Sequence, residues 1–144
     1  MLIKVHTDGG ARGNPGPAAV GVVIEEVKNE IRTIARFGKR IGEATNNAAE
    51  YKAVLEALQN LKSQISNRKL EDKEELQIQF FLDSNLVVNQ LNGRFKVKDP
   101  ELRELLTKIR ILEQEVGGNI RYNLIPREQN RRADFLVNHA LDNQ

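Results

Sequence analysis

The sequence predicts an α/β domain spanning residues 1–144, in which a five-stranded mixed β-sheet carries helices on both faces. Two observations lead to this prediction. Three β-rich stretches come first, joined by short polar or glycine-rich segments, and two further strands then alternate with amphipathic helices. A strand that follows a helical crossover should lie parallel to the first strand, whereas a strand joined to it by a hairpin should lie antiparallel. The length is sufficient for one substantial core.

Five stretches alternate apolar with polar residues or are rich in β-branched and aromatic residues, as strands are. The first two flank a loop rich in glycine and proline. Lys28-Asn29 separates the second from the third, which predicts a hairpin, and Gly42 is expected to end this region. The predicted strands are 2–8, 18–27, 30–38, 76–82 and 120–125.

Four segments are predicted to be helices, and the first and third carry apolar residues at helical spacing. Thr45 is the expected N-cap of the first helix, and residues 63–75 are read as its tail followed by a solvated connector. Pro100 suits the first turn of the third helix, and Gly117-Gly118 should end that helix. The three later helices are predicted at roughly 86–91, 100–116 and 129–141.

Composition limits the class of protein. The net charge of +2 and the pI near 9 permit a nucleic-acid partner without requiring one. The chain has no cysteine, which excludes disulfides and thiolate metal sites. No leader-like segment or membrane-length apolar run is seen, so we expect a cytoplasmic protein without a membrane partner. We also expect a monomer.

Four carboxylates stand at unusual positions. Asp8 and Asp83 each lie at the C-terminal end of a predicted strand. Because these two strands should be parallel neighbours, the two carboxylates should share one edge of the sheet. Glu50 lies on the face of the first helix that should look toward the sheet. Asp134 falls near the start of the last helix. Structural alternatives exist, because Asp8-Gly9 is also a common hairpin turn and an acid in a first helical turn favours the helix dipole.

Converging carboxylates favour a hard divalent cation. They repel one another and are costly to desolvate, and a bound cation offsets that cost. Mg²⁺ prefers oxygen ligands, whereas zinc is a poor candidate in a chain without cysteine and with histidine only at positions 6 and 139. We expect His6 to be partly buried in the core and His139 to lie on the surface.

Polar residues that suit phosphates and bases surround this predicted acidic edge. The N-terminus of a helix leaves N–H groups free to bind anions, and the first predicted helix begins with such residues. Each residue also has a plain structural role as a helix cap or a turn residue. The residues are Asn14, Thr45, Asn46, Asn47, Ser84 and Asn85.

Taken together, these motifs resemble type 1 ribonuclease H. The resemblance runs from about residue 2 to residue 141, and four motifs in the family's order are a specific signal. The matching stretches are Thr7-Asp8-Gly9-Gly10 with Gly13-Asn14-Pro15-Gly16-Pro17, then Thr45-Asn46-Asn47-Ala48-Ala49-Glu50-Tyr51, then Asp83-Ser84 with Leu86-Val87-Val88, and Pro126-Arg127-Glu128-Gln129-Asn130 before Ala133-Asp134.

The resemblance implies a ribonuclease H-like fold and an endonuclease that cuts the RNA strand of RNA/DNA hybrids, leaving 5′-phosphate and 3′-hydroxyl ends. It implies two Mg²⁺ or Mn²⁺ ions, with Asp8 bridging both and Asp134 serving the ion that activates water. Glu50 and Asp83 would serve the ion on the leaving-group side. The implied substrate contacts are Gly9, Gly10, Asn14, Thr45, Asn46, Asn47, Ser84 and Asn85.

Two departures from the family pattern matter. Many relatives carry a histidine in the loop before the last aspartate; this loop has none, and Glu128, with Arg127 beside it, is the candidate substitute. The segment from Gly93 to Glu101 is too short for the basic handle that some relatives insert, which predicts salt-sensitive binding. The alternatives are a nuclease that prefers double-stranded RNA and a silent binding module, which would not need four acids.

Overall fold

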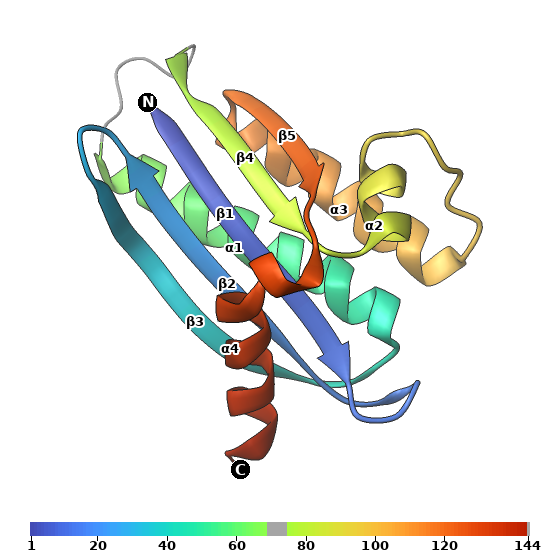
Figure 1. The fold of residues 1–144 in the computed structure, drawn as a ribbon. Helices are drawn as coiled ribbons and strands as arrows, with labels where there is room; N and C mark the ends of the chain where they lie inside the picture. The colour runs from blue at the N-terminus through green and yellow to red at the C-terminus, as the bar shows by residue number, and fades with distance from the viewer. Residues whose placement is uncertain (69–74, 144) are drawn as a thin grey trace.

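The computed structural model describes residues 1–68 and 75–143, and its five strands form one mixed sheet (Figure 1). The strands are β1 (Leu2–Ala11), β2 (Gly16–Val27), β3 (Ile31–Ala44), β4 (Gln77–Leu82) and β5 (Asn119–Leu124). Their order across the sheet is β3-β2-β1-β4-β5. β1 pairs antiparallel with β2 and parallel with β4, and β5 pairs parallel with β4. The predicted mixed sheet is confirmed.

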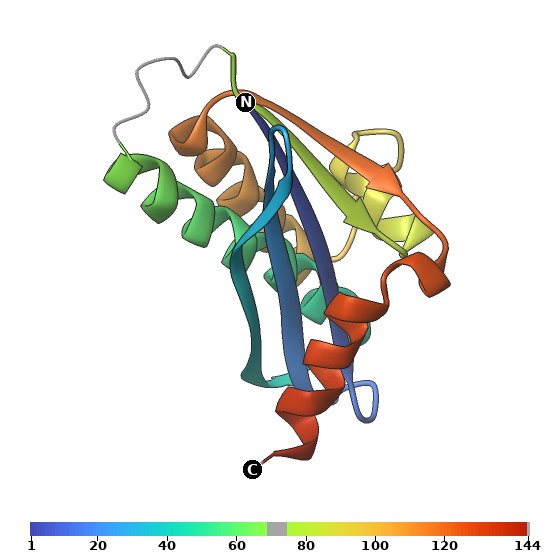
Figure 2. The same cartoon turned by 60° about the vertical axis from the view of Figure 1, so that its left-hand side comes forward.

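Helices cover both faces of the sheet, as predicted (Figure 2). α1, α2 and α3 pack on one face, and α4 packs on the other over β1, β2 and β3. In the part of the chain that the structure describes, no helix has the length and apolar character that a membrane crossing requires. The bounds are α1 (Asn46–Arg68), α2 (Asn85–Leu91), α3 (Pro100–Val116) and α4 (Arg131–Asp142), with a 3₁₀ turn, η2 (Arg127–Gln129), before α4.

The main core lies between the sheet and the helices α1 to α3. Alternate residues of the strands point into it, among them Val5 of β1 and Phe80 of β4, and both side chains are fully buried. Leu58 of α1 meets them from the helical side. A smaller apolar cluster under α4 contains Ala19 and Val137. Burial of these apolar faces holds α1 and α4 on opposite sides of β1.

The strands near the glycine-rich loop are longer than predicted. β1 continues through Gly9 and Gly10 to Ala11, so Asp8 lies within the strand, and its predicted place at the strand's end is wrong. β3 continues past residue 38 and past Gly42 to Ala44. Pairing with β2 supplies the backbone hydrogen bonds in both regions, which outweighs the weak strand propensity of glycine and of charged residues. The hairpin between β2 and β3 contains three residues, 28–30, rather than two.

The helix ends largely follow their predicted caps. The Thr45 hydroxyl accepts a hydrogen bond from the Ala48 N–H at 3.1 Å, and Asp99, directly before Pro100, caps α3 in the same way. α1 runs to Arg68; the rest of the predicted connector, residues 69–74, lies outside the described residues. α4 begins two residues later than predicted, because residues 127–129 form the 3₁₀ turn instead.

Candidate active site

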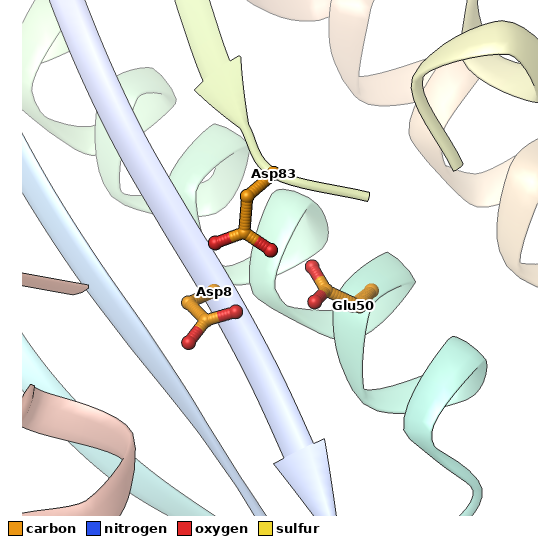
Figure 3. Close-up of side chains that lie close together, drawn as sticks. All are labelled: Asp8, Glu50 and Asp83. Carbon is orange, nitrogen blue, oxygen red and sulfur yellow. The ribbon is translucent and has the colours of Figure 1, made fainter. Parts of the chain in front are cut away.

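Three of the four predicted acids meet at one edge of the sheet (Figure 3). Asp8 comes from β1, Glu50 from the start of α1, and Asp83 from the residue directly after β4. One carboxylate oxygen of each lies within 4.8 Å of the others, and Figure 3 shows the three carboxylates facing a common space. We call these three residues the acidic cluster.

The pairing of β1 with β4 explains why the acids converge at this place. The ladder between the two strands ends at the pair His6 and Phe81, whereas β1 continues alongside β2. Asp8 and Asp83 both follow this last pair, at the carboxyl edge where ligands bind in α/β sheets. The space beyond the last pair is open to the side chains of both acids.

Asp134 approaches the acidic cluster from the opposite face of the sheet. The cross-strand partner of Asp8 is Gly21, and a Cβ on Gly21 would lie 2.2 Å from the carbonyl oxygen of Ala133. The missing side chain therefore lets the first turn of α4 rest on the sheet. Asp134 lines the same cavity as the cluster, about 370 Å³ in volume, although its carboxylate lies outside the 4.8 Å group.

Burial and the charges of neighbouring acids favour the protonated forms of Asp8 and Glu50. Burial, followed by the charge of Asp83 and with a smaller contribution from Asp134, raises the pKa of Asp8 to about 7, although a hydrogen bond with Glu50 acts to lower it. Burial and the charge of Asp8 raise the pKa of Glu50 well above its ordinary value. The Glu50 Oε2 atom is buried and has no hydrogen-bond partner among the described residues. An all-oxygen site whose charges lack compensation fits a hard divalent cation such as Mg²⁺.

Asn130 also contacts the cluster, although its place in the sequence indicates no role there. Its Nδ2 atom donates a hydrogen bond of 3.0 Å to Asp83 Oδ2 and one of 2.8 Å to the carbonyl oxygen of Thr7. Its side chain is almost completely buried. The residue lies inside the last matching motif, yet nothing in the order of residues indicates which groups its amide reaches.

Part of the predicted substrate-binding set lines the cavity, namely Gly9, Gly10 and Asn46. Asn14 does not line the cavity but holds the start of α1: its Oδ1 accepts a hydrogen bond of 3.0 Å from the Asn46 N–H. Asn46 Oδ1 accepts a hydrogen bond of 2.9 Å from the Ala11 N–H. The two asparagines thus fix the glycine-rich loop against α1.

The other predicted substrate-binding residues do not line this cavity. Thr45 and Ser84 cap α1 and α2 through their hydroxyl groups. Asn47 is exposed, as is Asn85, whose Oδ1 accepts a hydrogen bond of 2.9 Å from Asn89. They stand at the starts of α1 and α2, within two residues in the chain of the lining residues Asn46 and Asp83.

The two candidate auxiliary residues in the loop before α4 differ in their position relative to the cavity. Arg127 lines the cavity, whereas Glu128, the next residue of η2, is exposed and does not. The two histidines are placed as predicted. His6 is partly buried and stacks on Phe81, with ring centroids 4.9 Å apart, and His139 is exposed on α4.

Comparison with known proteins connects this geometry to a family. Residues 6–140 match the family model described as reverse transcriptase-like. The chain is 39% identical over 141 residues to ribonuclease HI of Halobacterium salinarum. That match covers 97% of the chain and 64% of the relative. It is 37% identical over 142 residues to the bifunctional protein Rv2228c of Mycobacterium tuberculosis. This match covers 99% of the chain but only 36% of the length of that relative.

A solved structure shows the same fold at higher identity. The crystal structure of LC11-RNase H1 in complex with an RNA/DNA hybrid superposes with a TM-score of 0.86 and is 45% identical in sequence. The superposition covers 97% of this chain and 96% of that one. The likeness therefore extends over the sheet and all the elements that carry the four acids.

Proposed function

Because the chain belongs to the type 1 ribonuclease H family, we propose that it is an endonuclease that hydrolyses the RNA strand of RNA/DNA hybrids with two divalent cations. The observation that carries the proposal is the convergence of the Asp8, Glu50 and Asp83 carboxylates within 4.8 Å, with Asp134 on the same cavity. A protein that only bound nucleic acid would not need four acids at one place, and the mutual repulsion of the acids disfavours such an arrangement.

The four acids would hold Mg²⁺ or Mn²⁺. When bound, such ions make water a stronger nucleophile and stabilise the charge on the attacking and leaving oxygens. The charges of Asp83 and Asp134 and a hydrogen bond with Glu50 all act on the pKa of Asp8, so Asp8 is the acid that would serve both ions. Asp134 would then serve the ion near the attacking water, and Glu50 and Asp83 the ion near the leaving oxygen.

The hybrid would cross the cavity and the first turns of α1 and α2. The relative LC11-RNase H1 has been crystallised with an RNA/DNA hybrid, and this chain shares its fold. Because Asn14 and Asn46 use their side-chain oxygens within the protein, their Nδ2 groups remain as donors for acceptors in the minor groove. Thr45, Asn47 and Arg127 suit phosphate, and the 2′-hydroxyl of RNA would be read near Gly9 and Gly10.

A nuclease that prefers double-stranded RNA remains the second candidate, because it would use the same acids and the same helix N-termini. The two differ in the duplex that they cut, not in the chemistry. For either substrate, water rather than the RNA 2′-hydroxyl is the attacking group, so the products should carry 5′-phosphate and 3′-hydroxyl ends.

Analysis of the product ends tests this mechanism. RNA fragments from a cleaved hybrid should be digested by an exonuclease that requires a 5′-phosphate, and a polymerase should extend them without prior phosphatase treatment. Fragments that end in a 3′-phosphate or a cyclic phosphate would contradict the proposal, because these ends indicate attack by the 2′-hydroxyl.

A further inference from the structure

We propose that Asn130 is a positioning residue, which sets the orientation of Asp83 and thereby the affinity of the four acids for divalent cations. This inference rests on the proposed function and deepens it. The buried amide of Asn130 contacts two of the segments that carry the acids, and the backbone of the same residue begins the segment that carries Asp134.

The hydrogen bonds of Asn130 fix the orientation of its amide. Both acceptors, the Thr7 carbonyl oxygen and Asp83 Oδ2, lack a hydrogen to donate, so the amide must present its nitrogen to them. A primary amide nitrogen carries two hydrogens, and both are used here. The Asn130 Oδ1 atom points the other way, is buried, and has no hydrogen-bond partner among the described residues.

Asn130 connects the segments that carry three of the acids. Thr7 directly precedes Asp8 on β1, and Asp83 directly follows β4. The backbone carbonyl of Asn130 accepts the Asp134 N–H at 3.1 Å, so the same residue begins the helical turn that carries Asp134. One residue therefore contacts the backbone next to Asp8, the carboxylate of Asp83 and the first turn that carries Asp134.

Asn130 does not use its side chain to cap the helix. It is the N-cap residue of α4, and asparagine at that position commonly accepts a hydrogen bond from an N–H in the first turn. Here no such bond forms, and the amide is turned toward Asp83 instead. The amide thus serves the acidic cluster at the expense of the helix end, which distinguishes a positioning role from ordinary capping.

The expected consequence is weaker binding of cations when the amide is lost. Asn130 restrains one oxygen of Asp83, so the rotation of the carboxylate is defined before a cation arrives. Loss of such an outer partner typically weakens metal affinity or activity by about 10- to 100-fold. Loss of the amide should lower the affinity for cations. The KM for the hybrid should not change, because Asn130 is buried and does not line the cavity.

Binding of Mn²⁺ to the protein without nucleic acid tests this inference. We compare wild type, Asn130→Ala and Asn130→Leu, which is neutral and similar in size to asparagine, by titration calorimetry, and we check folding by thermal unfolding in EDTA. Asn123→Ala is the matched control, because among the described residues the Asn123 amide donates only to the carbonyl oxygen of Phe80, at 3.2 Å. Both Asn130 variants should bind Mn²⁺ at least about 10-fold more weakly, and the control should bind like wild type. Raised Mn²⁺ should restore kcat for hybrid cleavage.

A double-mutant cycle shows whether Asn130 acts through Asp83. In an Asp83→Asn background, Asn130→Ala should cost no further Mn²⁺ affinity, because the group that it positions has lost its charge. Full additivity of the two losses would overturn the inference. So would a folded Asn130 variant with wild-type Mn²⁺ affinity, or failure of both variants to fold in EDTA, which would make Asn130 a structural residue. If wild type binds Mn²⁺ but cuts no hybrid, the proposed function fails and the positioning role survives.

Discussion

The backbone of Gly9 lies directly against the backbone of Glu50. A Cβ placed on Gly9 would lie 2.5 Å from the Glu50 backbone nitrogen and 2.3 Å from the carbonyl group of Ala49. Gly9 belongs to the extended strand β1, so it is the close approach of α1, and not an unusual backbone conformation, that requires glycine here. This contact brings the carboxylate of Glu50 to the carboxylate of Asp8.

Gly9→Ala should therefore move α1 away from β1. We expect the free energy of unfolding to fall by about 3 kcal/mol, because backbone atoms have little freedom to yield to an added methyl group. Gly10→Ala is the matched control for stability: its Cβ would meet the Cγ1 atom of Val137 at 3.6 Å, an ordinary contact. Urea unfolding in EDTA measures both variants, and equal stability of the two would show that the Gly9 contact is not restrictive.

Asp8→Asn should abolish cleavage while hybrid binding survives. Asp8 is the acid proposed to be shared by both cations, and asparagine keeps its shape while removing its charge. In metal-free protein at pH 8 the variant should be more stable than wild type, by on the order of 1 kcal/mol or more, because a buried and repelled charge has been removed. Cleavage at a near wild-type rate would place the reaction elsewhere on the protein.

The stability of the metal-free protein should depend on pH through Asp8. Its pKa is raised from 3.8 to about 7, so between these values the folded protein holds a proton that the unfolded chain has released. The contribution of Asp8 to the free energy of unfolding should therefore fall as pH rises from about 4 to about 7, and Glu50 acts in the same direction. Thermal unfolding in EDTA should show the advantage of Asp8→Asn growing over this range; a constant difference would contradict the raised pKa.

Much of the fold could be predicted because the signals are local. Alternating apolar residues indicated β4 and β5, and residues such as Thr45 and Pro100 indicated where helices begin. The length of β1 and β3 could not be predicted in this way. Gly9 and Gly10 look like a turn in the sequence, and only the pairing with β2 and the approach of α1 make them part of a strand.

The acids of the site were predictable for a related reason. Asp8 ends the recognisable alternation of the first strand, Asp83 directly follows another strand, and Glu50 lies on an otherwise apolar helix face. Asn130 was missed because its importance lies in two hydrogen bonds to groups 47 and 123 residues away, which no local pattern encodes. The exposure of Glu128 was likewise unpredictable, since it depends on the direction of the turn that precedes α4.

Glu128→Gln tests the loop that lacks the family's histidine. We expect a lower kcat with little change in melting temperature, because a carboxylate before Asp134 can assist the water or the release of product once the hybrid is bound. If Glu128 instead only favours the start of α4, stability should fall by roughly 0.3–1 kcal/mol and kcat should not change. Steady-state cleavage of one hybrid at saturating Mg²⁺, together with thermal unfolding of the same preparations, separates the two roles.

Strand-specific cleavage tests the central claim most directly. Wild-type protein is incubated with end-labelled RNA/DNA, RNA/RNA and DNA/DNA duplexes of one sequence, each with Mg²⁺, Mn²⁺ or EDTA. The three converging acids, with Asp134 on the same cavity, and the family relationship predict cleavage of the RNA strand of the hybrid with either cation and none in EDTA. Cleavage that survives excess EDTA, equal cutting of the DNA strand, or a hybrid left intact while RNA/RNA is cut would contradict it.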